Sequence, residues 1–187
     1  MKGDPQLLTW RSPFSPAYRD ERRLKRFRVT DAAYRHQEGP GGIWIGDRYW
    51  EAEVQDFLQG WKLGRAGYIE RLGMCGEDEL ATFAIAREVE PGRKYHIEAG
   101  AVGRRWRGTS AADGMMRDIF DQIRARPTGG DPTEGIPILV TSEIHWYNTA
   151  SQKLATRVHM ERIGTSDQPE HDTWGIPLEP RPLIDNG

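Results

Sequence analysis

One stretch of this sequence, between Lys94 and Gln122, constrains the fold more than any other. Residues 95–102 are typical of a short strand, and the basic loop Gly-Arg-Arg-Trp-Arg-Gly follows at 103–108. The next segment carries apolar residues at one-turn spacing, which predicts a helix; they are Met115, Met116, Ile119, Phe120 and Ile123. The stretch therefore predicts a strand, a basic turn and a helix in direct succession.

The turn into this helix has the properties of an anion-binding site. Arginines supply guanidinium forks, and the first helical turn supplies unpaired N–H groups and the positive end of the helix dipole. Thr109, Ser110, Ala111 and Ala112 are small, so an anion can approach the backbone closely. We expect a phosphate or pyrophosphate here. The alternative is an ordinary turn with a solvated basic face, because short glycine-containing matches are weak evidence.

The composition indicates one soluble, globular domain. The chain has 187 residues, of which 37% are hydrophobic and 29% charged. Its net charge of −2 argues against binding nucleic acid by bulk charge and leaves a local basic patch open. The lone Cys75 excludes an intrachain disulfide and a cysteine-cluster metal site. Without a signal core or an apolar run of roughly 18–20 residues, we expect a cytoplasmic protein that does not enter a membrane.

The first 28 residues differ in character from the rest. Residues 1–18 have no periodicity and contain three prolines, so we expect an extended arm. Arginine is dense over residues 19–28, which usually marks a solvated helix or the lead-in to a strand, and leaves open a contact with an acidic or nucleic-acid partner. We therefore expect an N-terminal arm over 1–26, one domain over 27–179 and a tail over 180–187.

The remaining pattern predicts an α+β domain. Strands are expected at 27–33, 69–76, 80–89, 95–102, 136–144, 160–165 and 173–178, with further helices beginning after Asp47 and Asn148. The first of these helices has an apolar face that we interpret as core, formed by Trp50, Val54, Phe57, Leu58 and Trp61. The strands at 95–102 and 136–144 are joined through a helix, so they should be parallel, and the other pairs antiparallel.

This order of elements resembles the GNAT superfamily of acyl-CoA-dependent N-acetyltransferases. In that superfamily a strand ending in Val leads into Arg/Gln-x-x-Gly-x-Gly/Ala at the start of a helix. Residues 102–112 fit this spacing, with Arg107 in the Arg/Gln place and Ala112 in the last small place. Ser110 stands where Gly is usual. A second register of the motif, beginning at Arg105, fits about as well.

A second motif follows the next strand. The superfamily has Asn, a small residue three positions on, an aliphatic residue three further, and then Gly-Phe or Gly-Met. The matching residues here are Asn148, Ser151, Leu154 and Met160. His159 replaces the Gly. Two weak motifs in the right order, separated by one strand, are stronger evidence than either alone.

The resemblance implies a mostly antiparallel mixed sheet with helices on both faces and a splayed pair of parallel strands. Acetyl-CoA would be the co-substrate, with its pantetheine arm between the splayed strands. The residues that would bind it are Ala101, Val102, Arg105, Arg107, Gly108, Thr109, Ser110, Ala111, Ala112, Asn148 and Ser151. Backbone groups near Ala101 and Val102 would pair with the arm and polarise the thioester carbonyl. For Asn148, a role as helix cap is an equally good interpretation.

Acetyl transfer to an amine also needs groups that move protons. The superfamily often has a Tyr acid directly after the aliphatic position of the second motif, and here that position is Ala155. Tyr147 is a nearby substitute, although a Tyr that packs by its ring is an equal alternative.

Four residues on the two parallel strands are candidates for the remaining catalytic roles. Glu98 and His96 share one strand face, and Glu143 and His145 form a similar pair on the facing strand. Each of them could instead be salt-bridged or exposed. The spacing of the histidines matches no metal-ligand pattern, so we expect no metal.

The expected function is therefore transfer of an acetyl group from acetyl-CoA to a primary amine on a small molecule or a protein. Two alternatives stay open. One is a catalytically degenerate acyl-CoA-binding protein, which Ala155 and Ser110 motivate, and the other is an acceptor linked to nucleic acid, which the arginines of 19–28 motivate. The sequence also leaves a homodimer open. Acceptor specificity is expected in the unmatched segments, at 34–68, 126–135 and 165–172.

Overall fold

The computed structural model describes residues 8–14, 17–30, 37–39, 42–44, 49–126 and 136–180. The helices are α1 (Tyr18–Arg26), α2 (Tyr49–Gly60), α3 (Ala111–Arg124) and α4 (Thr149–Arg157), with a short 3₁₀ helix at Arg104–Trp106. The strands are β1 (Leu8–Arg11), β2 (Gln37–Gly39), β3 (Gly42–Trp44), β4 (Tyr68–Cys75), β5 (Glu79–Glu90), β6 (Lys94–Val102), β7 (Ile138–His145), β8 (Glu161–Thr165) and β9 (His171–Leu178). No helix in these ranges is long and apolar enough to cross a membrane.

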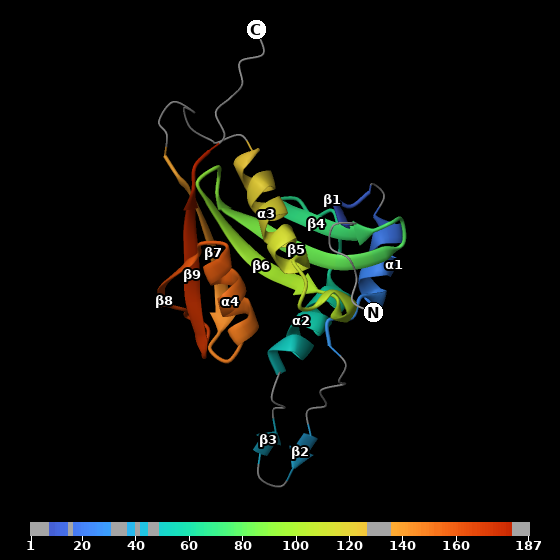
Figure 1. The fold of residues 1–187 in the computed structure, drawn as a ribbon. Coiled ribbons are helices and arrows are strands. Elements are labelled where there is room, and N and C mark those ends of the chain that lie inside the picture. Colours follow the sequence, from blue (N-terminus) through green and yellow to red (C-terminus); the bar gives the residue numbers. More distant parts are fainter. Residues whose placement is uncertain are drawn as a thin grey trace.

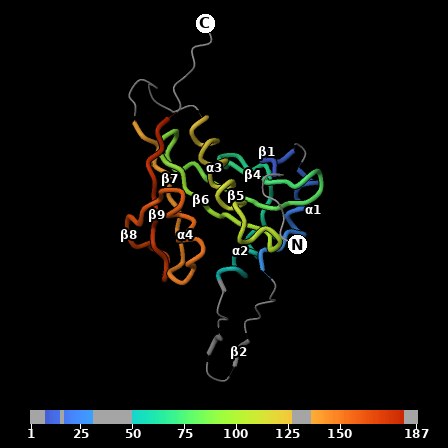
Figure 2. The backbone as a smooth tube through the Cα atoms, in the orientation of Figure 1, coloured from blue at the N-terminus to red at the C-terminus, as the bar shows by residue number. Residues whose placement is uncertain are grey.

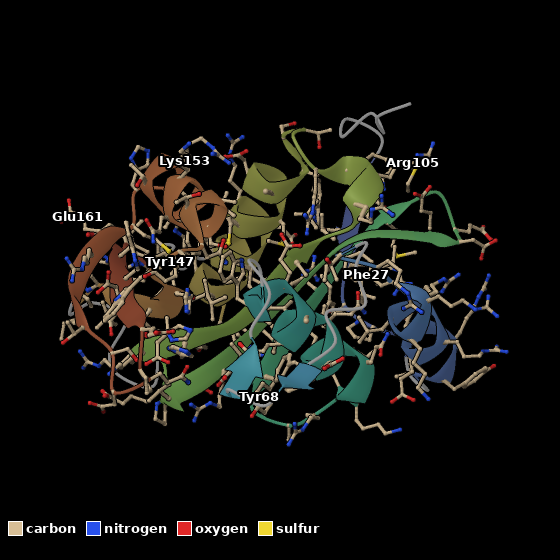
Figure 3. The ribbon with its side chains drawn as sticks, turned by 90° about the horizontal axis from the view of Figure 1, so that it is seen from below. Phe27, Tyr68, Arg105, Tyr147, Lys153 and Glu161 are labelled. Carbon is tan, nitrogen blue, oxygen red and sulfur yellow. The ribbon has the colours of Figure 1, made fainter. Side chains whose placement is uncertain are left out.

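Seven strands form one sheet in the order β1-β4-β5-β6-β7-β9-β8 (Figure 1). Neighbouring strands run antiparallel except β6 and β7, which are parallel. Helices α3 and α4 cover one face of the sheet, and α1 and α2 cover the other (Figure 3). The prediction of an α+β domain with a mixed, mostly antiparallel sheet and helices on both faces is confirmed.

Both faces of the central strands are buried, which explains why β5 is apolar at consecutive positions. Ala84 and Ala86 lie in the core under α3, whereas Phe83 and Ile85 lie in the core under α1 and α2. Successive side chains of a strand point to opposite faces, so a strand covered on both sides needs no polar positions. The apolar face of α3 lies in the first of these cores, as its one-turn spacing predicts.

Strand β6 contains a β-bulge at Glu98. Across the ladder to β5, Ile97 faces Ala86 and Ala99 faces Ile85, so Glu98 has no opposite residue. An extra residue reverses the face that the following side chains take. Ile97 therefore lies in the core under α3, and Ala99 lies in the core under α1 and α2. The bulge places irregular backbone next to the edge that β6 shares with β7.

The parallel strands part directly after this point. Strands β6 and β7 pair only from Lys94 opposite Leu139 to Ile97 opposite Ser142. Beyond Ile97, β6 stays paired with β5 while its other edge has no partner strand in the described part of the chain. Figure 2 shows β6 turning away from β7 and β9. The predicted splayed pair is therefore confirmed.

The described part of the expected N-terminal arm belongs to the folded domain. Strand β1 pairs with β4 at the edge of the sheet, and α1 buries Leu24 beneath it. The Trp10 ring packs on α3 at Gly114, where a Cβ would come within 2.7 Å of the ring. Where the structure describes the extended arm expected over 1–18, residues 8–11 form an edge strand and Tyr18 begins a helix. Periodicity could not reveal β1, because it has only four residues.

The strand expected at 27–33 does not form over its described residues. The side chain of Gln55 in α2 takes the place of a neighbouring strand. Its Oε1 accepts from the Val29 N–H at 2.9 Å, and its Nε2 donates to the Phe27 carbonyl at 3.0 Å. Because these backbone groups are satisfied by an amide, the segment needs no sheet partner. The last three residues of the expected strand, and the expected helix cap Asp47, lie outside the described part of the chain.

His159 follows α4 in a left-handed conformation, with a φ of +65°. It stands where the superfamily motif has Gly, and L side chains are strained in this conformation. We expect His159→Gly to raise the free energy of unfolding by about 0.5–1 kcal/mol, because the relieved strain exceeds the entropy cost of Gly. Urea unfolding measures the difference. His159→Ala keeps the strain and should gain nothing; a destabilised Gly variant would mean that the imidazole itself stabilises this turn.

Candidate active site

Two adjoining cavities occupy the splayed end of the sheet. The outer chamber, of about 420 Å³, extends to the start of α3, and the inner chamber, of about 240 Å³, lies between β6 and β7. The residues that line both are Trp50, Val54, Gly100, Met115, Asn148, Ser151 and Leu154. The two chambers therefore form one continuous cleft walled by α2, α3 and α4.

The loop between β6 and α3 closes the outer chamber. Gly108 lines it with a φ of +69°, a conformation that favours glycine. Thr109 ties the loop to α3: its Oγ1 donates to the Trp106 carbonyl at 2.6 Å and accepts from the Ala111 N–H at 3.2 Å. Ala111 is buried and its N–H is used within the protein. The structure therefore does not support Ala111 as an anion ligand.

Other backbone N–H groups of this turn are available. Those of Gly108, Ser110 and Ala112 have no acceptor within the described residues. Ser110 is the N-cap of α3, and its side chain makes no cap bond. Free N–H groups at the positive end of a helix bind phosphate oxygens. Of the three residues, Gly108 and Ala112 line the outer chamber, whereas Ser110 lines neither chamber.

The two arginines that the motif offers lie in different places. Arg107 lines the outer chamber, but its guanidinium donates to Glu51 of α2 at 3.1 Å and to the Val29 carbonyl. It therefore links α2 to the loop and keeps only part of its guanidinium for a ligand. Arg105 lines neither chamber and donates to Glu79 at 3.0 Å. The structure does not support Arg105 as a ligand in the cleft and favours the motif register that begins at Arg107.

Two cations on α4 were not predicted from the sequence. Lys153 and Arg157 line the outer chamber across from the start of α3. Arg157 donates to Asp113 at 2.8 Å, and this hydrogen bond raises the pKa of the guanidinium. Lys153 is exposed, with no ion pair to any residue that the structure describes; Figure 3 shows it and Arg105 on opposite sides of α3. The spacing of Ala150, Lys153 and Arg157 on one helix face was the available signal.

Asn148 caps α4 and also lines the cleft. Its Oδ1 accepts from the Ser151 N–H at 3.1 Å, which caps α4. Both residues also line both chambers. The cap uses the side-chain oxygen of Asn148, so its amide N–H groups remain for a ligand.

The free edge of β6 supplies backbone groups to the same chamber. Gly100, Ala101 and Val102 line the outer chamber on the side that β7 has left. An open strand edge presents N–H and C=O groups that an extended ligand can pair with as an added strand. The geometry is thus consistent with the predicted contacts of Ala101 and Val102 with a linear arm.

His96 lines the inner chamber where the two strands part. Its Nδ1 lies 3.1 Å from Oγ1 of Thr141, whose hydroxyl donates to the Tyr95 carbonyl at 3.3 Å. Because that hydroxyl proton is already used, Thr141 accepts from Nδ1–H. The Nε2 of His96 is therefore an unprotonated acceptor with no partner among the described residues.

The charge state of His96 follows from its surroundings. Burial lowers the pKa of the imidazole below its usual range, and the charges of Glu98 and Glu143 oppose this shift. The side chain is therefore neutral at pH 7. A neutral imidazole with one nitrogen fixed and the other free has the properties of a general base.

The carboxylates of the inner chamber act as fixed charges. Glu98 accepts from the Arg87 guanidinium, and Glu143 accepts from the Ser166 hydroxyl at 2.5 Å. Glu53 of α2 adds a third carboxylate, and no Lys or Arg from the described residues lines this chamber. Since Glu98 and Glu143 are already engaged, they are better suited to attract a cation than to accept its proton.

His145 has no nitrogen left for a substrate. Its Nδ1 accepts from the Tyr147 N–H at 3.1 Å, so Nε2 carries the proton and lies 3.2 Å from Oε2 of Glu170. The buried ring is stacked on Trp50, with centroids 5.1 Å apart, and meets His171 edge-on at 5.0 Å. The structure therefore gives His145 a positioning role and does not support it as the base.

The structure also shows where Tyr147 and Ala155, the two positions considered for the acid role, lie relative to the chambers. The Tyr147 side chain is 66% exposed and lines neither chamber. Ala155 is buried and lines the inner chamber. The structure does not support Tyr147 as a substitute acid, and no tyrosine lines either chamber in the described part of the chain.

Two further residues of the cleft were not identified from the sequence. Trp50, expected in the core, lines both chambers, whereas Leu58 and Trp61 of the same stripe are buried in the core. Helical spacing cannot separate these outcomes, because core and cleft lie along one helix face. His171 lines the inner chamber, with its Nδ1 at 2.7 Å from the Pro169 carbonyl. Within the described ranges, no three His, Cys, Asp or Glu side chains are grouped to hold a metal ion.

A mixed sheet whose parallel strands part around a cleft, beside an open strand edge and a loop that leads into a helix N-terminus, is the fold of the GNAT acetyltransferases. The particular solved structures that share it match nearly the whole chain. The GNAT domain of S. lividans PAT has a TM-score of 0.59 and 14% identity, over 91% of this chain and 90% of that one. Phosphinothricin acetyltransferase from Sinorhizobium meliloti, in complex with AcCoA, has a TM-score of 0.55 and 14% identity, over 92% and 89%.

A third match is the ribosomal-protein-S18-alanine N-acetyltransferase from Escherichia coli, with a TM-score of 0.53 and 12% identity over 96% of this chain and 98% of that one. No family model and no curated protein matches the sequence. At these identities the likeness establishes the GNAT fold, and the reaction has to be argued from the cleft.

Proposed function

We propose that this protein is an N-acetyltransferase that transfers an acetyl group from acetyl-CoA directly to a primary amine. The observation that carries the proposal is His96, a neutral imidazole whose free Nε2 lines the inner chamber where the parallel strands part. A histidine that serves only the core has both nitrogens satisfied, as His145 does.

The outer chamber fits the coenzyme. The free N–H groups of Gly108 and Ala112, with the Lys153 ammonium across the chamber, suit a pyrophosphate. The open edge of β6 at 100–102 suits the amides of a pantetheine arm. Bound acetyl-CoA supplies the activated acetyl group as a thioester.

The residues of the chain then position the amine and remove its proton. The carboxylates of the inner chamber attract the acceptor as an ammonium ion, and Nε2 of His96 accepts one proton from it, which frees the nitrogen lone pair for attack on the thioester carbonyl. The second proton leaves the nitrogen after the C–N bond has formed, and the departing thiolate takes it up as the C–S bond breaks. We expect backbone N–H groups near the Glu98 bulge to donate to the acetyl oxygen as negative charge develops on it. A thiol with a pKa of about 8.5 leaves readily as the thiolate. The reaction therefore does not require a tyrosine at Ala155.

The same chamber defines the acceptor. Glu53, Glu98 and Glu143 line it without a Lys or Arg from the described residues, and Trp50 adds an aromatic ring. Carboxylates and an aromatic face both favour a cation. The acceptor is therefore an amine that is positively charged in solution, on a small molecule or a protein.

Lys153→Glu is expected to weaken acetyl-CoA binding about 10- to 100-fold, because one charge-assisted contact with a phosphate is replaced by repulsion. Calorimetric titration with acetyl-CoA measures the change. Lys62→Glu makes the same charge change on an exposed residue that lines neither chamber and should leave the affinity unaltered. Equal affinities for the wild type and both variants would show that acetyl-CoA does not bind in the outer chamber.

The second candidate function is binding of acyl-CoA without turnover. Two observations favour it: Ala155 occupies the place of the usual acid, and Tyr147 lies outside the chambers. A broad panel of amines with acetyl-CoA, followed by release of free thiol, separates the two. Silence across the panel, together with micromolar binding of acetyl-CoA, would establish the binding protein and rule out the transferase.

A further inference from the structure

A second concave surface lies on the far side of the loop at 103–106, away from the cleft. It is a groove of about 780 Å³ between α1 and the loop, which we call the arginine groove. Seven arginines line it: Arg19, Arg22, Arg23, Arg26, Arg28, Arg104 and Arg105. Only two carboxylates, Asp78 and Glu79, accompany them, so the groove has a formal excess of five positive charges in a chain of net charge −2.

Ion pairs inside the protein use only part of this charge. Asp78 accepts from Arg19 at 3.2 Å and from Arg23 at 3.0 Å, and these bonds lower the pKa of its carboxyl. Glu79 accepts from Arg105. The two carboxylates are thus already engaged with three arginines, and the groove retains cations that they do not neutralise.

Three arginines of the groove have no carboxylate partner among the described residues. Arg28 donates only to backbone carbonyls, Arg22 lies over the Tyr18 ring at 5.8 Å, and Arg26 is exposed. An unpaired guanidinium fork keeps its donors for a bidentate contact with a phosphate.

The charges are arranged as a row. Arg19, Arg22 and Arg26 follow one another at three and four positions on one face of α1, which places them along about 10 Å of the helix axis. A single phosphate would contact one or two of these side chains. A ligand that repeats phosphates along a chain can contact the whole row.

The walls of the groove offer little for a base to stack on. Its apolar residues, Phe27, Leu80 and Trp106, are between 2% and 8% exposed. Recognition here is therefore of phosphates and not of bases. The residues outside the groove sum to about −7, so they repel a polyanion and confine it to this surface.

We propose that the arginine groove binds the phosphodiester backbone of a nucleic acid strand, without regard to base sequence. The groove is concave, so it admits one strand, either alone or as the edge of a duplex, whereas a flat anionic membrane reaches only its rim. This inference does not rest on the proposed acetyltransferase activity, because the cleft shares only Trp106 with the groove.

Fluorescence anisotropy with the full chain tests the proposal, using a labelled 20-nucleotide RNA, the matching DNA strand and the duplex at several salt concentrations. We expect binding of unrelated sequences with equal affinity. We also expect log K to fall linearly with log salt, by roughly 0.7 for each phosphate contacted on a single strand.

Arg22→Gln/Arg26→Gln should weaken binding about 10-fold and flatten the salt slope by roughly 1.4, because two phosphate contacts are lost. Lys62→Gln/Arg117→Gln removes the same charge from exposed positions outside the groove and should leave the affinity and slope unchanged. The charge-conserving Arg22→Lys/Arg26→Lys should restore most of the affinity, which separates charge from a folding defect.

Three results would overturn the proposal. One is no measurable binding of any oligonucleotide, and another is equal weakening by the groove and control variants. The third is displacement of the oligonucleotide by saturating CoA, which would assign the groove to the coenzyme. A parallel titration with vesicles containing anionic lipid should show no dependence on Arg22 and Arg26. If the vesicles bind in a way that depends on these two arginines, and no oligonucleotide binds, the ligand of the groove is a membrane and not a nucleic acid.

Discussion

His96→Asn is expected to lower kcat about 10²- to 10⁴-fold, because it removes the side chain that we propose as the general base. The Asn amide can still donate to Thr141, so the join between β6 and β7 is kept, but no nitrogen remains that can accept the amine's proton. Release of free thiol from acetyl-CoA with a fixed amine measures kcat. Affinity for acetyl-CoA should stay within about twofold, because His96 lines only the inner chamber.

His171 provides the sharpest comparison. It lines the same chamber and also has its Nδ1 at a backbone carbonyl, so a free Nε2 alone does not distinguish it from His96. The two histidines differ in position. His171 lies opposite His145 in the β7–β9 ladder, at the C-terminal end of β7, whereas His96 lies where β6 and β7 part. A large loss of kcat in His171→Asn, with His96→Asn active, would transfer the base role to His171.

The pH profile gives a second measure of the same assignment. An imidazolium cannot accept a proton, so kcat/KM should rise with pH through the pKa of His96, which burial lowers below about 6.5. His96→Asn should lose this acidic limb and keep any dependence due to ionisation of the amine. An unchanged limb in the variant would show that another group titrates there.

Asp20→Asn is expected to lower the free energy of unfolding by about 3–5 kcal/mol, the range for removing one partner of a buried ionic network. Asp20 is fully buried and joins three parts of the N-terminal region. Its carboxylate accepts from Arg11 at 2.7 and 2.8 Å, from the Phe14 N–H at 2.9 Å and from Arg23 at 2.8 Å. Urea unfolding at pH 7 measures the loss. Asp121→Asn, in an exposed pair with Arg124, should cost less than about 0.5 kcal/mol.

The same network should make stability depend on acid pH. Burial alone would raise the pKa of Asp20, but the bonds from Arg11, Phe14 and Arg23 outweigh it and lower the pKa to about 2. The unfolded value is about 3.9, so about 2 kcal/mol of stability is present above pH 4 and is lost as the pH falls towards 2. The difference in stability between the wild type and Asp20→Asn should therefore narrow by about 2 kcal/mol over that interval. A constant difference between them would mean that the stabilisation does not come from ionisation of Asp20.

The two halves of the molecule differ in how well local patterns described them. Residues 69–178 contain long strands and an amphipathic helix, and their order was predicted from spacing and turn residues. The N-terminal region was not, because β1 is four residues long and Gln55 satisfies the segment after α1 with a side-chain amide. Neither a four-residue strand nor a pair of side-chain hydrogen bonds produces a periodic pattern in the sequence.

The cleft shows the same division. The turn into α3 and the cap at Asn148 depend on residues near one another in the chain, so both could be predicted from the sequence. Which of several candidate bases is free to react depends on partners from other elements: Thr141 fixes the tautomer of His96, and Glu170 occupies His145. The cations Lys153 and Arg157 likewise became part of the outer chamber only when α4 packed beside the start of α3.

Sequence alone determined the order of elements, the parallel pair, and the loop at which an anion can bind, because periodicity, chain direction and glycine-rich turns act over a few residues. Tertiary structure decided which side chains share the cleft and which of their atoms remain unpaired. It also placed Arg104 and Arg105 across from the arginines of α1, about 80 positions away in the chain. Burial and hydrogen bonding between distant segments set the reactivity of a side chain, and these come into being only when the sheet and its helices assemble.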